Sequence, residues 1–147
     1  ISWFGDMNNV LFSYFELLNF YPSLQFNVFT DKSVYDECIK KFPNVDNVNF
    51  FFEIRNDIIK NSDCIMTDVF TSMNDINKDK EKILKNFQVN IELLNMTKES
   101  CVFMHCLPAN KGIEVTEEVL MSSKSIIMQQ AKNRLVAQKG ILQWLNI

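Results

Sequence analysis

Short apolar runs typical of strands alternate with helix-type segments along this chain. The apolar runs are rich in Phe, Val and Ile, and the segments between them carry apolar residues at helical spacing or open with capping residues. Such alternation indicates βαβ units, which build a parallel sheet with helices packed against it. We therefore expect an α/β fold: a Rossmann-like, open, mostly parallel sheet flanked by helices, in a single domain.

The positions of the elements follow from this pattern. Strands are predicted at residues 1–4, 26–29, 48–52, 64–69, 101–105 and 125–128. Helices are predicted at residues 8–20, 31–41, 56–60, 75–86, 90–96, 116–120 and 129–145. Asp6 or Asn8 is expected to cap the first helix, and Thr30 or Asp31 the second.

Composition excludes several classes of protein. Hydrophobic residues make up 47% and charged residues 22%, as in ordinary globular proteins, and the net charge is −3. The absence of a basic stretch argues against a nucleic-acid partner, and no apolar run is long enough to span a membrane. The chain opens directly on an apolar strand, so we expect a domain cut from a longer protein. Our expected location is the cytosol, or the mitochondrial matrix if a transit peptide precedes the chain.

Neither a metal nor a cofactor is expected. The four cysteines lack CxxC spacing, which argues against a zinc site and fits reduced thiols. The glycine-containing turn at residues 5–9 (GDMNN) lacks the second and third glycines of a dinucleotide-binding fingerprint.

Polar residues follow three of the predicted strands. They lie at residues 5–9 (GDMNN), 67–73 (TDVFTSM) and 105–108 (HCLP). Right-handed crossovers bring the carboxyl ends of parallel strands to one edge of the sheet, where ligands bind. Asp68 ends a buried strand and needs a partner, either a substrate ammonium group or the imidazole of His105. The three segments therefore predict one shared cleft.

Taken singly, each of these segments also fits a purely structural role. A single histidine beside a cysteine more often packs than reacts, because neighbouring residues on a strand point to opposite faces. The asparagines fit simple helix capping, and Asp68 fits a loop anchor.

Together the motifs resemble those of the second, amino-acid-binding domain of the ornithine carbamoyltransferase family. GDMNN resembles the family's GDxNN, and TDVFTSM its TD-x-W-x-SMG loop. FMHCLPANKGIEVTEEVL is similar to the HCLP loop and the segment beyond it, and AKNRLVAQKGIL to the AENRLHAQKA helix. The resemblance runs in order over essentially the whole chain, and the combination is far more specific than any one motif.

The resemblance implies an ornithine site and the partners of a larger enzyme. The residues implied to hold the α-amino and carboxylate ends of ornithine are Asn9, Asp68, Ser72 and Met73. The implied substrates are ornithine and carbamoyl phosphate, with no cofactor. The family's first domain, with its Ser-x-Arg-Thr and His-Pro-x-Gln segments, is missing from these residues. Since the family works as a homotrimer with its site between two domains, we expect the chain alone to be inactive.

The resemblance also implies a catalytic loop. Cys106 is implied as the catalytic residue beside the reacting δ-amine, and His105 would help to orient that amine and accept its proton. The main chain of Cys106 and Leu107, together with Arg134, would bind carbamoyl phosphate. The Leu107–Pro108 peptide bond should be cis, as it is in the family.

Some positions depart from the family's motifs. Asn74 replaces a glycine, Phe70 a tryptophan, Val136 a histidine and Lys132 a glutamate. Lys132 reverses a charge beside Arg134, and we expect it to face solvent.

The last helix leaves two packings open. In the family it packs on the missing domain, which would leave its apolar residues exposed here. They could instead pack on this domain's own sheet. The residues concerned are Ile141, Leu142, Trp144 and Leu145.

Three other functions compete with this interpretation. A sister transcarbamylase would act on another amine, although Ser72 and Met73 favour ornithine. A non-catalytic relic of the enzyme would fit Asn74, Lys132 and the missing first domain. A cysteine hydrolase is disfavoured, because hydrolase dyads come from distant segments and His105 and Cys106 are adjacent.

Overall fold

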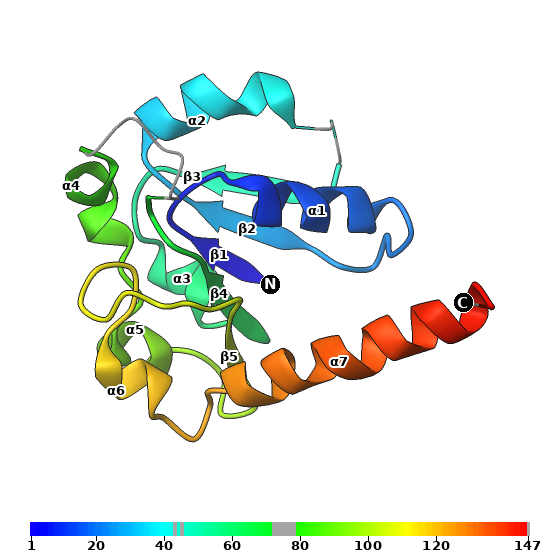
Figure 1. Cartoon of the computed structure of the whole chain (residues 1–147). Coiled ribbons are helices and arrows are strands. Elements are labelled where there is room, and N and C mark those ends of the chain that lie inside the picture. Colours follow the sequence, from blue (N-terminus) through cyan, green and yellow to red (C-terminus); the bar gives the residue numbers. More distant parts are fainter. Residues whose placement is uncertain (43, 45, 72–78, 147) are drawn as a thin grey trace.

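The fold is a single parallel sheet with helices around it (Figure 1). The structure, a computed structural model, describes residues 1–42, 44, 46–71 and 79–146. Within them the sheet order is β3-β2-β1-β4-β5, and every strand pair is parallel. The strands are β1 (Ser2–Phe4), β2 (Phe26–Phe29), β3 (Val48–Phe51), β4 (Cys64–Thr67) and β5 (Val102–His105). The predicted α/β, Rossmann-like fold is confirmed.

The helices occupy most of the predicted segments. They are α1 (Asn9–Leu18), α2 (Lys32–Cys38), α3 (Asn56–Ile59), α4 (Lys80–Leu84), α5 (Ile91–Asn95), α6 (Glu117–Leu120) and α7 (Ile127–Trp144). Short 3-10 turns, Ile39–Lys41 and Lys85–Phe87, follow α2 and α4. Asn8 caps α1 and Asp31 caps α2 through their side-chain oxygens, as predicted. Asp6 instead pairs with Lys80.

Two predicted elements differ from the structure. The strand expected at residues 125–128 is wrong: Ser125 forms one isolated bridge with Phe103, and Ile127 already begins α7. Residues 125–128 contain three apolar residues in a row, and so short a run is compatible with a strand or with the first turn of a helix. Of the helix expected at residues 75–86, the structure has α4 and the turn after it, while residues 75–78 lie outside the described residues.

A row of aromatic rings crosses the carboxyl end of the sheet. Phe4, Phe29 and Phe51 end β1, β2 and β3 and are paired in register. Their rings stack at centroid distances of 4.7 Å and 5.1 Å. Burying one such side chain stabilises the fold by about 1.5–3 kcal/mol. The row therefore holds these strand ends level.

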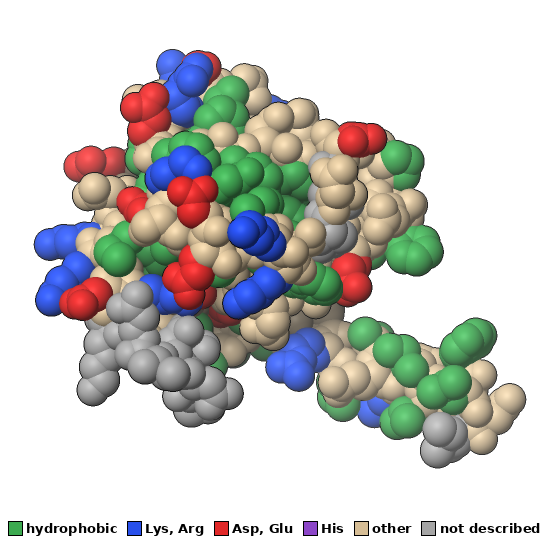
Figure 2. All heavy atoms as spheres, turned by 90° about the horizontal axis from the view of Figure 1, so that it is seen from above, with side chains coloured by type: hydrophobic (Ala, Val, Ile, Leu, Met, Phe, Trp, Pro, Cys, Tyr) green, Lys and Arg blue, Asp and Glu red, His purple; other side chains and the backbone are tan. Residues whose placement is uncertain are grey.

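Helix α7 extends away from the rest of the molecule (Figures 1 and 2). None of its residues is buried, and apolar side chains lie along its length. Ile141, Leu142 and Trp144 of α7 and Leu145, which follows it, are 49–80% exposed. Of the two packings left open by the sequence, the exposed one is therefore found. Among the described residues no helix combines the length and apolarity that crossing a membrane requires.

Candidate functional site

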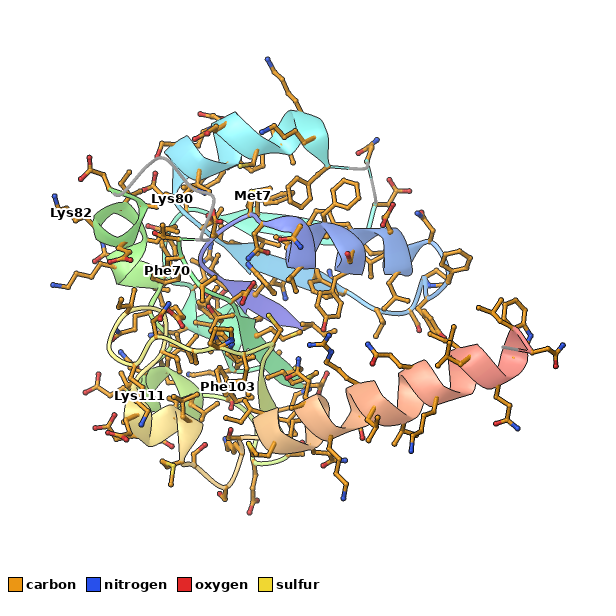
Figure 3. All side chains as sticks on the ribbon, viewed as in Figure 1. Met7, Phe70, Lys80, Lys82, Phe103 and Lys111 are labelled. Atoms are coloured by element: carbon orange, nitrogen blue, oxygen red, sulfur yellow. The ribbon has the colours of Figure 1, made fainter. Side chains whose placement is uncertain are left out.

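The candidate site lies at the carboxyl ends of β1, β4 and β5. Strand β1 pairs with β2 on one side and with β4 on the other. Strands β2 and β3 are added on the first side and β4 and β5 on the second, so the strand order switches between β1 and β4. Ligands of open α/β sheets bind at such a switch point. Figure 3 shows Met7 and Phe70, which follow β1 and β4, at this same end of the sheet.

Gly5 makes the turn out of β1 possible. Its φ is +107°, a conformation that favours glycine, and a Cβ built there would lie 2.3 Å from Cε1 of Phe70. Phe70 is fully buried, so its ring closes against the glycine and leaves no room for a side chain. This contact sets how the segments after β1 and β4 approach each other.

Asp68 is the centre of the site. Its Oδ1 accepts a hydrogen bond from the Sγ of Cys106 at 2.9 Å, and its Oδ2 accepts one from Nδ2 of Asn8 at 2.7 Å. The Asn8 amide oxygen meanwhile accepts the Val10 and Leu11 N–H groups of α1. Asp68 is only 7% exposed, so these bonds supply the partners that a buried carboxylate needs. The predicted convergence of residues 68 and 106 is confirmed.

The thiol of Cys106 is neutral at physiological pH. Burial raises its pKa, the hydrogen bond and negative charge of Asp68 raise it further, and the pKa reaches about 12. A backbone hydrogen bond and the Arg134 guanidinium act in the opposite direction and are outweighed. Cys106 is therefore a hydrogen-bond donor to Asp68 rather than a thiolate.

His105 does not pair with Asp68, although β4 and β5 are adjacent and Thr67 lies opposite His105. Its ring is fully buried, with Nδ1 accepting the Leu107 N–H at 3.0 Å. Nε2 lies 3.3 Å from Oε1 of Glu114 in a contact too poorly aligned for a standard hydrogen bond. The protein partners of Asp68 are thus Asn8 and Cys106, and not His105 as predicted.

Two cavities meet at the loop after β5. The first, about 460 Å³, is lined by residues that include Cys106, Leu107, Gln130 and Arg134. The second, about 450 Å³, is lined by residues that include Asn9, Asp68, Cys106 and Leu107. The main chain of Cys106 and Leu107 thus lies between them, and the predicted cis Leu107–Pro108 bond is confirmed.

The remaining predicted residues divide into those the structure places and those it does not. Arg134 and Lys132 are both exposed on α7, and Arg134 lines the first cavity. The expectation that Lys132 faces solvent is confirmed. Ser72, Met73 and Asn74 lie outside the described residues.

Sequence reasoning missed two residues of this site. Asn8 was predicted as a helix cap within the segment that contributes to the cleft, but its hydrogen bond to Asp68 was not predicted. Glu114 was not singled out; the signal available for it is that its two chain neighbours, Ile113 and Val115, are apolar.

The described residues contain one group able to offer a metal three ligands. Asp68, His105 and Cys106 have ligand atoms within 4.8 Å of one another. Both ring nitrogens of His105 already face protein partners, and the thiol keeps its proton. A metal ion would have to displace these contacts, so the donor set does not favour one.

Comparison with known proteins places this geometry in one family. Residues 1–145 match the family described as aspartate/ornithine carbamoyltransferase, Asp/Orn binding domain. An ornithine carbamoyltransferase of Nitrobacter winogradskyi is 38% identical over 149 residues, covering 98% of this chain and 47% of that protein. The chain thus spans about half the length of the curated relatives it matches over its full extent.

Solved structures agree with this assignment. The ornithine carbamoyltransferase of Thermus thermophilus is 33% identical, with a TM-score of 0.77 over 96% of this chain and 46% of that one. The enzyme of Pyrococcus furiosus is 32% identical, with a TM-score of 0.78 over 96% of this chain and 47% of that one.

Proposed function

The chain belongs to the aspartate/ornithine carbamoyltransferase family, and we propose that it is the ornithine-binding half of an ornithine carbamoyltransferase. The proposed reaction moves the carbamoyl group of carbamoyl phosphate to the δ-amine of ornithine, which gives citrulline and phosphate. The observation that carries the proposal is the Asp68 carboxylate, held by Asn8 and Cys106 at the wall of the second cavity.

Ornithine recognition is assigned to the second cavity. The α-ammonium group of ornithine would pair with Asp68, since a buried carboxylate favours a cation beside it. Asn9 lines the same cavity and would bind the amino-acid end of the substrate. Ser72 and Met73 are proposed to complete this site from the segment that follows Thr71.

Transfer needs an uncharged amine, whereas a free alkyl amine is mostly protonated at neutral pH. We assign Cys106 the role of orienting the δ-amine, because a thiol with a pKa of about 12 is not an effective base at neutral pH. The ammonium group first releases a proton to solvent, and the uncharged amine nitrogen then attacks the carbamoyl carbon. The bond from that carbon to the phosphate oxygen breaks, and a second amine proton passes to the departing phosphate. Arg134 would bind the phosphate oxygens from the first cavity.

The proposed partner is a carbamoyl-phosphate domain supplied by the rest of a longer, trimeric protein. The chain spans about half the length of its relatives, and Arg134 is exposed on a helix that leaves the sheet. The 147-residue chain is therefore expected to make no citrulline alone.

Calorimetry on the complete protein tests the ornithine site. Asp68→Asn should weaken ornithine binding about 10- to 100-fold, because a hydrogen bond to a charged group contributes about 1.5–3 kcal/mol. Asp36→Asn, which changes an exposed carboxylate on α2, should leave the affinity unchanged. Equal affinities for Asp68→Asn and the parent protein would contradict the proposal.

Competing ligands separate the alternatives. Ornithine should bind more tightly than putrescine, which lacks the α-carboxylate, and than N-acetylornithine, whose α-amine is blocked. Tighter binding of either competitor would favour a sister transcarbamylase. Ornithine binding by a complete protein that forms no citrulline would favour a relic.

A further inference from the structure

A fully buried glutamate lies directly behind the catalytic loop. Glu114 has no exposed surface, and its Oε1 accepts the N–H of Asn110. The same oxygen lies 3.3 Å from Nε2 of His105. Glu114 therefore contacts both ends of the loop that runs from His105 to Asn110. Burying a carboxylate costs free energy unless polar contacts compensate for the lost hydration, so the contacts to Asn110 and His105 stabilise Glu114 in its buried position.

The hydrogen bonds of His105 define which nitrogen carries the ring proton. Because Nδ1 accepts the Leu107 N–H, it has no proton of its own. The proton of the neutral ring then sits on Nε2, which faces the Glu114 carboxylate. Moving the proton to Nδ1 would set two N–H groups against each other and release Leu107.

The hydrogen bond from Leu107 to His105 stabilises an unfavourable backbone conformation. The φ of Leu107 is +45°, in the left-handed region that non-glycine residues seldom adopt. Such a conformation persists only where surrounding contacts fix it. The contact that fixes the Leu107 amide is the His105 ring, and the contact on the other side of that ring is Glu114.

We propose that Glu114 is a positioning residue: its buried carboxylate holds the His105 ring with the proton on Nε2, and so keeps residues 106–110 in the conformation that lines both cavities. The link to catalysis rests on the proposed function, since Cys106 and Leu107 are shared by the two cavities. On this view His105 acts through the Leu107 main chain rather than on the substrate, because its ring is buried.

Histidine tautomers can be measured directly. His105 is the single histidine of the chain, so imidazole ¹⁵N spectra of the 147-residue protein contain one ring. The parent protein should show a non-protonated Nδ1 and a protonated Nε2. Glu114→Ala should give a mixture of tautomers, whereas Glu114→Gln, which keeps an oxygen facing the ring and Asn110, should largely restore the parent spectrum. Glu117→Gln changes an exposed carboxylate paired with Lys111 nearby and should leave the spectrum unchanged.

Kinetics of the complete protein supply the second measurement. Glu114→Ala should lower kcat/KM for citrulline formation about 10- to 100-fold, on the order of the loss that follows removal of the carboxylate partner of a metal-binding histidine. Glu114→Gln should recover most of this loss, and Glu117→Gln should match the parent protein. If Glu114→Ala does not fold, Glu114→Asp replaces it, because shortening the side chain withdraws the oxygen from the ring.

The outcomes separate this inference from the proposed function. A protonated Nδ1 in the parent protein overturns the inference. It is also overturned if Glu114→Ala, or Glu114→Asp in its place, shows the same tautomer and the same kcat/KM as the parent protein. A complete protein that neither binds ornithine nor makes citrulline refutes the proposed function. In that case the tautomer spectra still decide whether Glu114 sets the ring and the loop.

Discussion

Replacing Asp68 by Asn should make the Cys106 thiol more reactive. In the parent protein the pKa of Cys106 is about 12, so at pH 8 the thiolate fraction is about 10⁻⁴. Since burial remains, removing the Asp68 charge should lower the pKa by about one to two units and raise the thiolate fraction about 10- to 100-fold. Because the nucleophilicity of a thiolate falls as its pKa falls, the alkylation rate should rise only about 3- to 15-fold.

Site-resolved alkylation measures this change. The protein is treated with iodoacetamide at pH 8, and modification of each cysteine is followed by peptide mass spectrometry. Cys38, Cys64 and Cys101 are buried, so their slow modification reports whether the fold remains intact. Asp36→Asn serves as the control, since it removes an exposed carboxylate on α2. Burial is the largest cause of the raised pKa and remains, so Cys106 should stay less reactive than a free thiol.

Two results would refute the reasoning about Cys106. An unchanged rate at Cys106 in the Asp68→Asn variant would mean that the carboxylate does not hold the thiol proton. An equal rise at Cys64 and Cys101 would mean that the substitution loosens the whole domain rather than changing the pKa of one group.

Three further predictions concern stability. Lys80→Met removes the ammonium group that lies 3.2 Å from the buried carboxylate of Asp6 and should cost about 3–5 kcal/mol in urea unfolding, against about 0–1 kcal/mol for Lys82→Met at an exposed pair. Gly5→Ala places a Cβ 2.3 Å from an aromatic ring and should cost at least about 2 kcal/mol, more than Gly112→Ala, where φ is also positive but space is open. Burial raises the pKa of Cys64 from 9.0 to about 12. The contribution of this thiol to the unfolding free energy should therefore be constant below pH 9 and fall by about 1.4 kcal/mol per pH unit between pH 9 and about pH 12.

Each of these stability predictions has an opposing outcome. If Lys80→Met and Lys82→Met lower the free energy of unfolding equally, the Lys80–Asp6 pair is as well hydrated as an exposed ion pair. Equal losses for Gly5→Ala and Gly112→Ala would mean that the neighbouring ring yields freely. An alkaline decline of the same slope in Cys64→Ala would assign that decline to other groups.

Much of this site follows from one rule applied to the sequence. The positions of Asp68 and Cys106 at the ends of predicted strands, together with the tendency of parallel strands to align their carboxyl ends, predict that they meet. The hydrogen bond between them confirms this. The rule works here because β4 and β5 are neighbours whose last residues, Thr67 and His105, lie opposite each other in the sheet.

The parts that sequence reasoning missed depend on side-chain direction. Asn8 and Asn9 are adjacent and chemically identical, and only the helix start decides that Asn8 turns toward Asp68 while Asn9 is exposed. Glu114 is separated from His105 by a loop whose path has no periodic signal. Residues 125–128 were misassigned because short apolar runs do not distinguish a strand from the first turn of a helix.

The two cavities differ in what builds them, and this difference has a consequence for binding. The cavity beside Asp68 is walled by segments that follow β1, β4 and β5, all fixed by the sheet. The cavity beside Arg134 has one wall on α7, whose residues from Ala131 onward are exposed. Fixing an exposed arginine side chain on a helix that leaves the sheet costs conformational entropy that a preformed wall does not. The chain alone should therefore bind ornithine measurably, whereas phosphate affinity should appear only when a further surface packs on α7. Equal affinity for phosphate in the chain and in the complete protein would contradict this division.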